Sequence, residues 1–413
     1  MAEHNDEVLL RVENLCQYFK SGKYENKAVN NVSFEIKKGE VFGLVGESGC
    51  GKTTTGRSII KLYDITSGSV YFKGRRICAG TRSYQDAIHA ARARINDEIK
   101  ALKKENAPET AVQIAAKKAE LAEIIAQNRT EIKSARHDNK YSDRDYAREL
   151  AEQVTAEYEE KLKNARPSEV AQIRKDFRRD LRIAKKTKLI TKIQMIFQDP
   201  SASLNPRMTV KEIISEGLVV NGIKDKEYIE KKVYEILELV GLVREHAGRY
   251  QHEFSGGQRQ RIGIARSVIM RPDMIIADEP ISALDVSIQA QVINLLNELR
   301  ETLGLTILFI AHDLSVVKYF SDRIGVMYFG NMVELASSDE LFTHPLHPYT
   351  RSLLSAIPQP DPHSEKQRKR ITYHAAAEHD YSVDKPSFRE IVPGHFVYCN
   401  DAEEKKYKEE LGV

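Results

Sequence analysis

Short apolar segments alternate with helical patterns over both ends of this chain. Residues 9–13 and 32–36 alternate between apolar and polar side chains, which is the period of a half-buried strand. Longer apolar runs, typical of strands buried on both faces, occupy residues 41–45, 193–197, 274–277 and 306–311. Helices are predicted over residues 52–61, most of 199–254, and 287–302. The sequence therefore predicts an α/β fold, in which a mainly parallel sheet is covered by helices on both faces and an antiparallel β part lies near the start.

The pattern changes over residues 81–188, which are rich in Ala, Glu, Lys and Arg. Apolar residues recur there in narrow stripes at helical spacing, the width expected of helices packed in a coiled-coil arm. Breaks near Pro108, residues 137–142 and Pro167 predict three or four antiparallel helices. Because an even number would return the chain to its point of departure, we interpret this stretch as an insertion that leaves the host domain intact.

Composition adds few constraints. The 413 residues are 41% hydrophobic and 30% charged, and the formal net charge of +3 implies no general attraction to nucleic acid or acidic membranes. The longest apolar run, residues 305–311, is far shorter than the roughly 20 residues that span a bilayer. Four cysteines lie far apart, as in a reducing cytosol, and residues 1–7 do not resemble a secretory signal. We expect a cytosolic chain that docks on a membrane through partners.

A glycine-rich loop lies between the predicted strand 41–45 and the predicted helix 52–61. Its glycines allow backbone N–H groups to turn inward and cradle phosphate oxygens beside the positive end of the helix. Lys52 would add a charge near the β- and γ-phosphates, and the Thr53 hydroxyl is an expected Mg²⁺ ligand. The expected nucleotide-binding residues of this loop are Gly46, Glu47, Ser48, Gly49, Cys50, Gly51, Lys52, Thr53 and Thr54.

Two carboxylates follow the apolar run 274–277. A buried strand that ends in acids beside a phosphate-binding loop is suited to holding Mg²⁺ and activating water. Asp278 would orient Mg²⁺ through its water shell, and Glu279 would polarise the attacking water.

With these motifs in this order, the chain resembles the nucleotide-binding subunits of ABC transporters. Residues 197–200 resemble the Q-loop of that family, in which Gln198 would reach Mg²⁺ and the water and sense a transmembrane partner. Residues 282–285 resemble the D-loop, and His312 resembles the switch histidine that contacts the γ-phosphate. The resemblance implies ATP as the nucleotide, Glu279, His312 and Gln198 as catalytic residues, and Thr53, Gln198 and Asp278 as Mg²⁺ ligands.

Residues 254–258 resemble the family's signature sequence, with phenylalanine in place of the usual leading leucine. The resemblance implies that ATP held by a second subunit is bound by Ser255, Gly256, Gly257 and Gln258. Ser255 would cap the following helix and aim its positive end at that nucleotide. Near the start of the chain, Phe19 or its neighbour Tyr18 would stack on the adenine.

Within the family, residues 198–207 and 347–350 resemble the branch that powers oligopeptide and dipeptide importers, and residues 204–208 resemble its second, F-type ATPase subunit. This resemblance covers about residues 8–77 and 190–360. It implies that ATP closes a heterodimer with a second ABC ATPase subunit and thereby moves two transmembrane permease subunits, on the cytoplasmic face of the membrane. An extracytoplasmic binding protein would select the cargo, which the sequence leaves open among peptides, nickel and sugars.

The same resemblance divides the chain into an ABC ATPase domain and two additions. The domain would comprise residues 1–80 and 189–335, with a helical subdomain at about 199–257. The arm at 81–188 would interrupt it, and a C-terminal extension at 336–413 would follow it. The family's extension often carries several cysteines that can bind an iron–sulfur cluster. Here Cys399 stands with His395 four residues before it, and we predict no metal there. After Pro358 we expect a loosely packed tail.

A second interpretation is an ABC-type ATPase that acts on nucleic acid through its arm. The insertion precedes Gln198, the arm is short, and residues 347–350 are typical of importers, so no nucleic-acid partner is expected. Residues 174–188 hold eight basic residues and two acidic ones, which suits a solvated helix face or a surface for lipid headgroups or an acidic partner. Deletion of residues 82–188 is expected to leave ATP binding intact.

Overall fold

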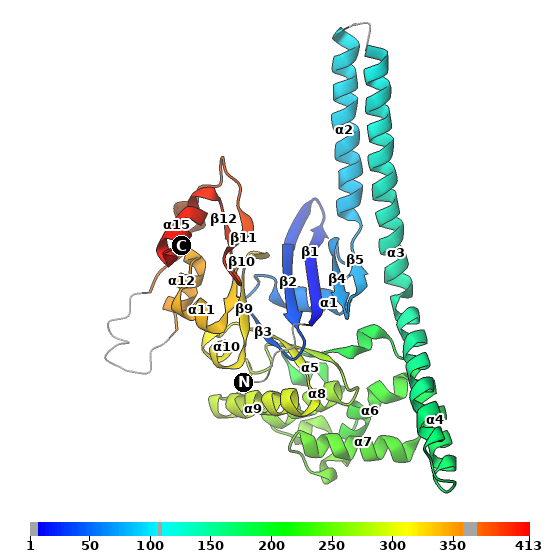
Figure 1. Cartoon of the computed structure of the whole chain (residues 1–413). Helices are drawn as coiled ribbons and strands as arrows, with labels where there is room; N and C mark the ends of the chain where they lie inside the picture. The colour runs from blue at the N-terminus through cyan, green and yellow to red at the C-terminus, as the bar shows by residue number, and fades with distance from the viewer. Residues whose placement is uncertain (1–6, 106–109, 358–369) are drawn as a thin grey trace.

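The structure is a computed structural model that describes residues 7–105, 110–357 and 370–413. A long helical arm stands beside a body built on two sheets, and the C-terminal region lies on the side of the body away from the arm (Figure 1). The larger sheet has the strand order β11-β12-β10-β9-β3-β8-β7-β6, and the smaller has the order β2-β1-β4-β5. Within the described ranges, no helix is long and apolar enough to span a bilayer.

The larger sheet is parallel through its centre and antiparallel toward the C-terminal region. Its parallel strands are β3 (Val41–Val45), β6 (Ile193–Ile196), β7 (Met274–Asp278), β8 (Thr306–Ala311) and β9 (Arg323–Tyr328). Its antiparallel strands are β10 (Asn331–Ser337), β11 (Ser387–Val392) and β12 (His395–Cys399). The smaller, antiparallel sheet contains β1 (Val8–Ser21), β2 (Tyr24–Lys37), β4 (Ser67–Phe72) and β5 (Arg75–Ala79). The predicted mainly parallel sheet with an antiparallel β part is confirmed.

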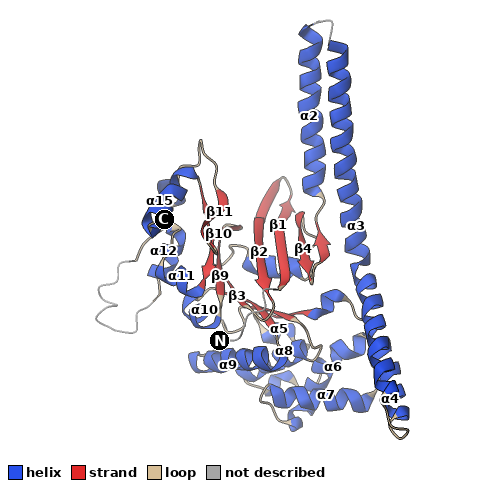
Figure 2. Cartoon of the chain, in the orientation of Figure 1, coloured by secondary structure: helices blue, strands red, loops and turns tan. Residues whose placement is uncertain are grey.

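Apolar side chains on the two faces of the larger sheet pack into two separate cores. One face packs on the smaller sheet and α1 (Lys52–Ile59), where the Phe34 and Phe42 rings stack with centroids 5.1 Å apart. The other face packs mainly on helices, as Figure 2 shows. These are α5 (Pro200–Ser203), α6 (Val210–Val220), α7 (Lys226–Leu239), α8 (Gly256–Val268), α9 (Val286–Leu303) and α10 (Leu314–Phe320). Because both faces are covered, the central strands can be apolar throughout their length.

The arm consists of α2 (Arg82–Glu105), α3 (Thr110–Lys163) and α4 (Val170–Ala184). The predicted break at residues 137–142 is wrong, because α3 runs through them as one helix of 54 residues. Pro167 does lie between α3 and α4, whereas Pro108 lies outside the described residues. An odd number of helices still returns the chain to the body, because α2 pairs with one end of α3 and α4 with the other (Figure 1).

Polar contacts fix the middle of α3 to the smaller sheet. Asn139 exchanges two hydrogen bonds with the backbone of Ala79, both at 2.8 Å. The Arg76 guanidinium donates to the Asp138 carboxylate at 2.8 Å. The sequence suggested a helix break here because the residues are polar. Their polar side chains instead bind β5, and the helix continues.

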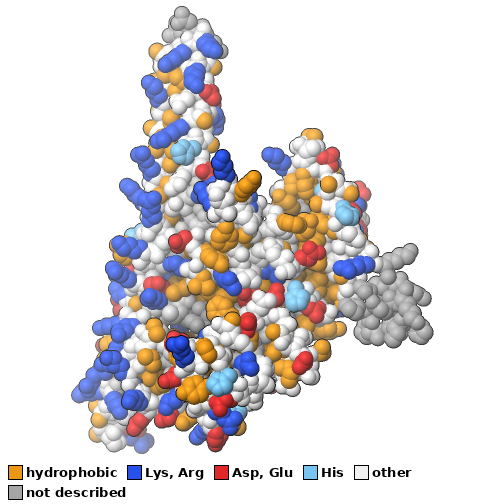
Figure 3. Space-filling model, turned by 180° about the vertical axis from the view of Figure 1, so that it is seen from behind, with side chains coloured by type: hydrophobic (Ala, Val, Ile, Leu, Met, Phe, Trp, Pro, Cys, Tyr) orange, Lys and Arg blue, Asp and Glu red, His pale blue; other side chains and the backbone are white. Residues whose placement is uncertain are grey.

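The lower end of the arm is basic and faces the helices next to the larger sheet. Lys and Arg side chains gather along the outer edge of the arm, as Figure 3 shows from behind. Between α4 and the turn that joins α6 to α7 lies a pocket of about 490 Å³, whose lining includes Arg178, Arg182 and Lys224. Arg179 instead lies over the Tyr228 ring of α7, 4.8 Å from its centroid. The chain then passes through a short 3₁₀ helix, η1 (Leu189–Lys192), directly into β6.

The C-terminal region is packed more firmly than the sequence suggested. Its helices are α11 (Ser338–Thr343), α12 (Pro348–Ser355), α14 (Ala375–Glu378) and α15 (Asp401–Leu411). The expected loosely packed tail is wrong for residues 387–411, because β11 and β12 join the larger sheet through β10 and α15 packs on them. Residues 358–369, to which the same expectation applied, lie outside the described residues. His395 and Cys399 lie at the two ends of β12, and both side chains are buried.

Two deletions test the contacts at the base of the arm. Removal of residues 82–188 is expected to lower the melting temperature, because β5 loses its cover and several hydrogen bonds that contribute about 1 kcal/mol each. Removal of only the tip, residues 96–119, with a short turn joining the ends, is expected to change it by less than about 3 °C, because the base contacts remain. Thermal denaturation of both variants measures the difference, and equal melting temperatures would contradict the structural role of the base.

Candidate functional site

The glycine-rich loop of residues 46–51 leads directly into α1. Gly51, the residue before α1, has a φ of 109°, and a Cβ there would lie 2.2 Å from the Ala28 carbonyl oxygen. A Cβ at Gly46 would lie 2.2 Å from the Met327 carbonyl oxygen. Only glycine therefore fits at these two positions. No side chain of the described residues caps α1, so its first backbone N–H groups can bind an anion.

The Lys52 side chain folds back over this loop. It is 4% exposed, and its ammonium donates to the carbonyl oxygens of Gly46 at 2.7 Å and Glu47 at 3.0 Å. Phosphate oxygens are stronger acceptors than these carbonyls because they carry charge. A bound phosphate chain would therefore be expected to take over the Lys52 ammonium.

A buried carboxylate lies beside the start of α1. Asp278 ends β7 and is fully buried, and its Oδ1 accepts a hydrogen bond from the Thr53 hydroxyl at 2.7 Å. Its Oδ2 has no hydrogen-bond partner among the described residues. Burial raises the pKa of Asp278, and the bond from Thr53 opposes that shift. A carboxylate oxygen without a partner next to a hydroxyl is a donor set that suits a hard cation such as Mg²⁺.

Three of the predicted catalytic residues meet at one carboxylate oxygen. The Gln198 amide donates to Oε2 of Glu279 at 2.8 Å, and Nδ1 of His312 lies 3.3 Å from the same oxygen. Glu279 directly follows β7 and has a positive φ of 44°. Its backbone N–H donates to the carbonyl of Ile310 in β8 at 2.9 Å, and this bond fixes Glu279 beside the end of β8. The carboxylate can therefore accept a proton from a water that the two neighbouring side chains help to position.

The residues that resemble the signature sequence lie at the N-terminus of α8. Ser255 accepts a hydrogen bond from the Gln258 N–H at 3.4 Å, and the Gln258 side chain accepts one from the Ser255 N–H at 3.1 Å. This capping box leaves Ser255 and Gly256 exposed. No hydrogen bond between described residues joins residues 255–258 to residues 46–54. The structure thus presents the start of α8 to solvent and not to the glycine-rich loop of the same chain.

A connection between Gln198 and α8 could not be predicted from the motifs. The Arg259 guanidinium donates to the Ser201 hydroxyl at 2.8 Å, and Arg266 donates to the Ser203 carbonyl at 2.7 Å. The segment of residues 199–204 thus ties α8 to Gln198, the second residue after β6. The sequence shows that Arg259 and Arg266 lie on one predicted helix, but their partners in residues 201 and 203 are set by the tertiary fold.

The aromatic residues near the start of the chain differ in their surroundings. The Phe19 ring is 38% exposed and contacts Tyr63 edge-on at 5.3 Å. The Tyr18 hydroxyl instead donates to the Asn30 side chain at 2.6 Å. Of the two, Phe19 therefore has the ring face that a ligand can reach.

One further contact reaches the loop from the C-terminal region. The Tyr349 hydroxyl accepts a hydrogen bond from the Glu47 N–H at 3.1 Å. The sequence signal was residues 347–350, which indicated a family branch but no part in the site.

Family models match most of this chain. A family model described as "ABC transporter" matches residues 29–158 and 162–282, and one described as "Oligopeptide/dipeptide transporter, C-terminal region" matches residues 333–385. The first match thus includes arm residues that the resemblance noted in the sequence had left out.

Curated relatives match over nearly the whole chain. The oligopeptide transport ATP-binding protein OppF of Bacillus subtilis is 45% identical over 402 residues, covering 97% of this chain and 99% of that protein. The dipeptide transport ATP-binding protein DppF of Lactococcus lactis is 42% identical over 404 residues, covering 97% of this chain and 96% of that protein. Among solved structures, CbiO1 of Clostridium perfringens, part of the ABC transporter complex CbiONQ, matches with a TM-score of 0.50 at 20% identity, covering 82% of this chain and 91% of that one. That structural match shows a shared fold.

Substitution of Gly51 tests the crowded geometry of the loop. Gly51→Ala is expected to weaken nucleotide binding at least about tenfold, because its Cβ would displace the Ala28 carbonyl and with it the loop. Gly74→Ala is the matched control, since Gly74 also has a positive φ, 72°, but no atom lies within 4 Å of the position that a Cβ would take there, so only about 1 kcal/mol of backbone strain is expected. Titration with a fluorescent ATP analogue compares the two, and equal affinities would contradict the steric argument.

Proposed function

The chain belongs to the ABC transporter family as an ATP-binding subunit of the oligopeptide and dipeptide importers, and on this premise we propose how its residues use ATP. It is an ATPase whose activity powers peptide import. It works with membrane permease partners in an ABC complex. An activity on nucleic acid finds no support among these relatives.

ATP binds with its phosphates in the loop of residues 46–54. The uncapped start of α1 supplies N–H donors, and Lys52 leaves the Gly46 and Glu47 carbonyls for the β- and γ-phosphates. The exposed Phe19 ring stacks on the adenine. The glycine positions that exclude any Cβ support this arrangement.

Mg²⁺ accompanies the nucleotide at the edge of β7. Thr53, Asp278 and Gln198 would hold it, and the Oδ2 of Asp278, which has no partner among the described residues, is the observation that supports this donor set. When bound, the ion neutralises charge on the phosphates. Asp278 itself stays anchored through its hydrogen bond with Thr53.

Glu279 is the general base for hydrolysis. It accepts the proton of the water that attacks the γ-phosphate, while Gln198 and His312 orient the carboxylate and the water. The single observation that carries this proposal is the contact of both side chains with one Glu279 oxygen, at 2.8 and 3.3 Å. His312, which is exposed, can also donate to the γ-phosphate.

The signature residues serve a second nucleotide. Ser255, Gly256, Gly257 and Gln258 face the ATP of a second ABC ATPase subunit, and that subunit's signature covers the ATP of this chain. The start of α8 is exposed and capped, and within the described ranges it makes no hydrogen bond to the loop of residues 46–54, which supports a shared site of this kind. The two subunits close on one another because ATP binds the closed heterodimer more tightly than the open one.

Closure is transmitted to two permease subunits on the cytoplasmic face of the membrane, with an extracytoplasmic binding protein delivering the peptide. The bonds from Arg259 and Arg266 to residues 201 and 203 support coupling between α8 and Gln198. We further propose the division into an ATPase domain at residues 1–80 and 189–335, an arm at 81–188 and an extension at 336–413.

Neutralisation of Glu279 tests the catalytic assignment. Glu279→Gln is expected to slow ATP hydrolysis about 100-fold or more while ATP still binds, because the amide keeps the shape of the side chain but accepts no proton. Phosphate release and the ATP retained by the assembled transporter measure the two effects.

Glu298→Gln is the matched control, since it neutralises an exposed carboxylate on α9 and should hydrolyse ATP at the normal rate. If Glu279→Gln hydrolysed ATP as fast as this control, Glu279 would not be the base.

A further inference from the structure

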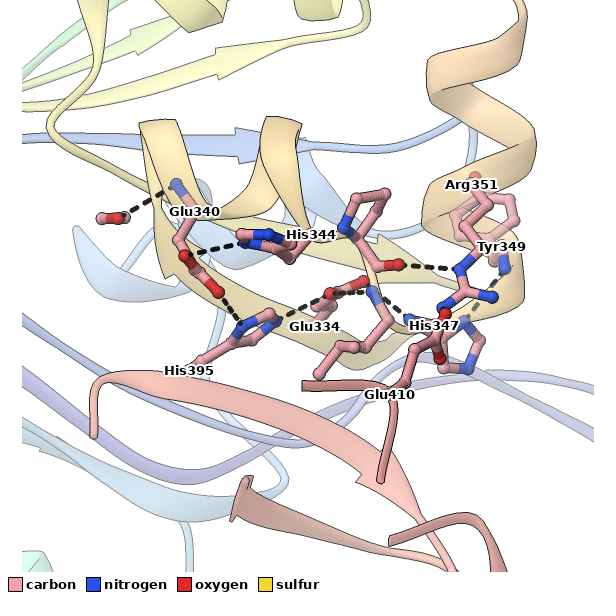
Figure 4. A network of polar contacts seen from close by, with 11 residues as sticks. Glu334, Glu340, His344, His347, Tyr349, Arg351, His395 and Glu410 are labelled. Carbon is pink, nitrogen blue, oxygen red and sulfur yellow. Dashed lines mark hydrogen bonds and ion pairs between the residues drawn. The ribbon is translucent and has the colours of Figure 1, made fainter. Parts of the chain in front are cut away.

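A buried polar network links the C-terminal region to the glycine-rich loop. At its centre, the fully buried Glu334 of β10 contacts Nε2 of His395 through Oε1 at 2.9 Å. The same carboxylate accepts hydrogen bonds from the backbone N–H groups of Leu346 at 2.8 Å and His347 at 3.1 Å. Figure 4 shows Glu334 between His395 on one side and the segment leading to Tyr349 on the other. Glu334 thus fixes the start of α12 to the larger sheet.

His347 extends this constraint by two residues. Its Nδ1 accepts a hydrogen bond from the Tyr349 N–H at 3.1 Å, which requires an unprotonated nitrogen. Burial lowers the pKa of His347 to about 3, and the nearby His379 and Arg351 act in the same direction. The ring is therefore neutral at physiological pH, and the backbone of Tyr349 is held at the first turn of α12.

Tyr349 ends the network at the loop. Its ring is 2% exposed and packs between Tyr328, at a centroid distance of 4.4 Å, and Tyr373, at 5.5 Å. Burial also raises the pKa of Tyr349, so the hydroxyl keeps its proton. Because the ring cannot turn freely, its oxygen is held where it accepts the Glu47 N–H at 3.1 Å.

The crest of the loop, residues 47–49, is the part of the loop with the least packing to hold its shape. These residues are exposed, whereas Gly46 and Cys50 on either side are buried. The Glu47 carbonyl is bound from within the loop, by the Cys50 N–H at 3.3 Å and the Lys52 ammonium at 3.0 Å. If ATP draws Lys52 away, the second of these bonds is lost. The bond from Tyr349 reaches the crest from outside the loop and does not depend on Lys52.

We propose that Tyr349 is a positioning residue for ATP binding: its hydroxyl holds Glu47 so that the loop keeps its cradle shape when Lys52 moves to the phosphates. Glu334, His347 and His395 act through Tyr349, which makes the C-terminal region part of the nucleotide site. This inference rests on the proposed binding of ATP at residues 46–54. It gives the extension a role inside its own chain, in addition to any contact with other subunits.

Tyr349→Phe tests the inference, because it removes the hydroxyl and keeps the buried ring. The dissociation constant for ATP is expected to rise roughly threefold to tenfold, the range for one lost hydrogen bond. The hydrolysis rate at saturating ATP should stay within about twofold of wild type, since the residue acts on binding and not on the chemical step. In hydrogen exchange, the peptide that contains the Glu47 amide should exchange faster in the full-length variant.

Tyr373→Phe is the matched control. It removes a hydroxyl from a ring of the same aromatic cluster, and that hydroxyl has no hydrogen-bond partner among the described residues. Its ATP affinity and Glu47 exchange should equal those of wild type. If Tyr373→Phe weakened ATP binding as much as Tyr349→Phe, the effect would come from loosened packing and the inference would be wrong.

Glu334→Gln provides a second, independent test. It weakens the hold on residues 346 and 347, so it should raise the dissociation constant in the same direction, and adding it to Tyr349→Phe should weaken binding little further. Fully additive effects would contradict a path through Tyr349.

A Lys52→Ala variant separates this inference from the proposed ATP site. If that variant bound ATP as wild type does, the site itself would be misassigned. If Lys52→Ala lost binding but Tyr349→Phe matched wild type in affinity and exchange, only the role of Tyr349 would be refuted.

Discussion

The parallel register of the central strands is the constraint on which the site depends. Val45 pairs with Ala311, Asp278 with Ile310, and Ile196 with Ala277. The chain therefore leaves β3, β6, β7 and β8 at one edge of the larger sheet, and the loops that follow them begin side by side. Gly46, Gln198, Glu279 and His312 each lie in the first residues after one of these strands. Residues far apart in the chain meet because their strands are buried in one register.

The parts of the site that follow from local chemistry could be predicted from the sequence. Backbone geometry and charge indicate a phosphate-binding role for Gly46, Gly51 and Lys52. The same reasoning indicates a catalytic or metal-binding role for the two acids after the buried strand. The contact between Gln198 and Glu279 could be expected only through family resemblance, since nothing local to either residue specifies the other.

The errors have a common cause. Asp138 and Asn139 look like a helix end in isolation, but their polar groups bind Arg76 and Ala79, and the helix continues. The strands β11 and β12 are short and follow a long polar stretch, and their backbone groups are satisfied because β12 pairs with β10 and β11 pairs with β12. In both cases a partner distant in the chain satisfies polar groups that seemed to require a turn or solvent.

The continuity of α3 has a mechanical consequence. A helix of 54 residues is about 80 Å long, and the body holds it near its middle, through Asn139, while its lower part is joined to α4. Arg179 of α4 also touches Tyr228 of α7, so the helices beside the larger sheet contact the opposite end of the arm from its tip. The 24 residues of α2 are about 36 Å long, so a tilt of the arm by about 10° at its base would carry the tip through about 6 Å. A rigid arm of this length would therefore turn a small tilt at its base into a larger displacement at its tip.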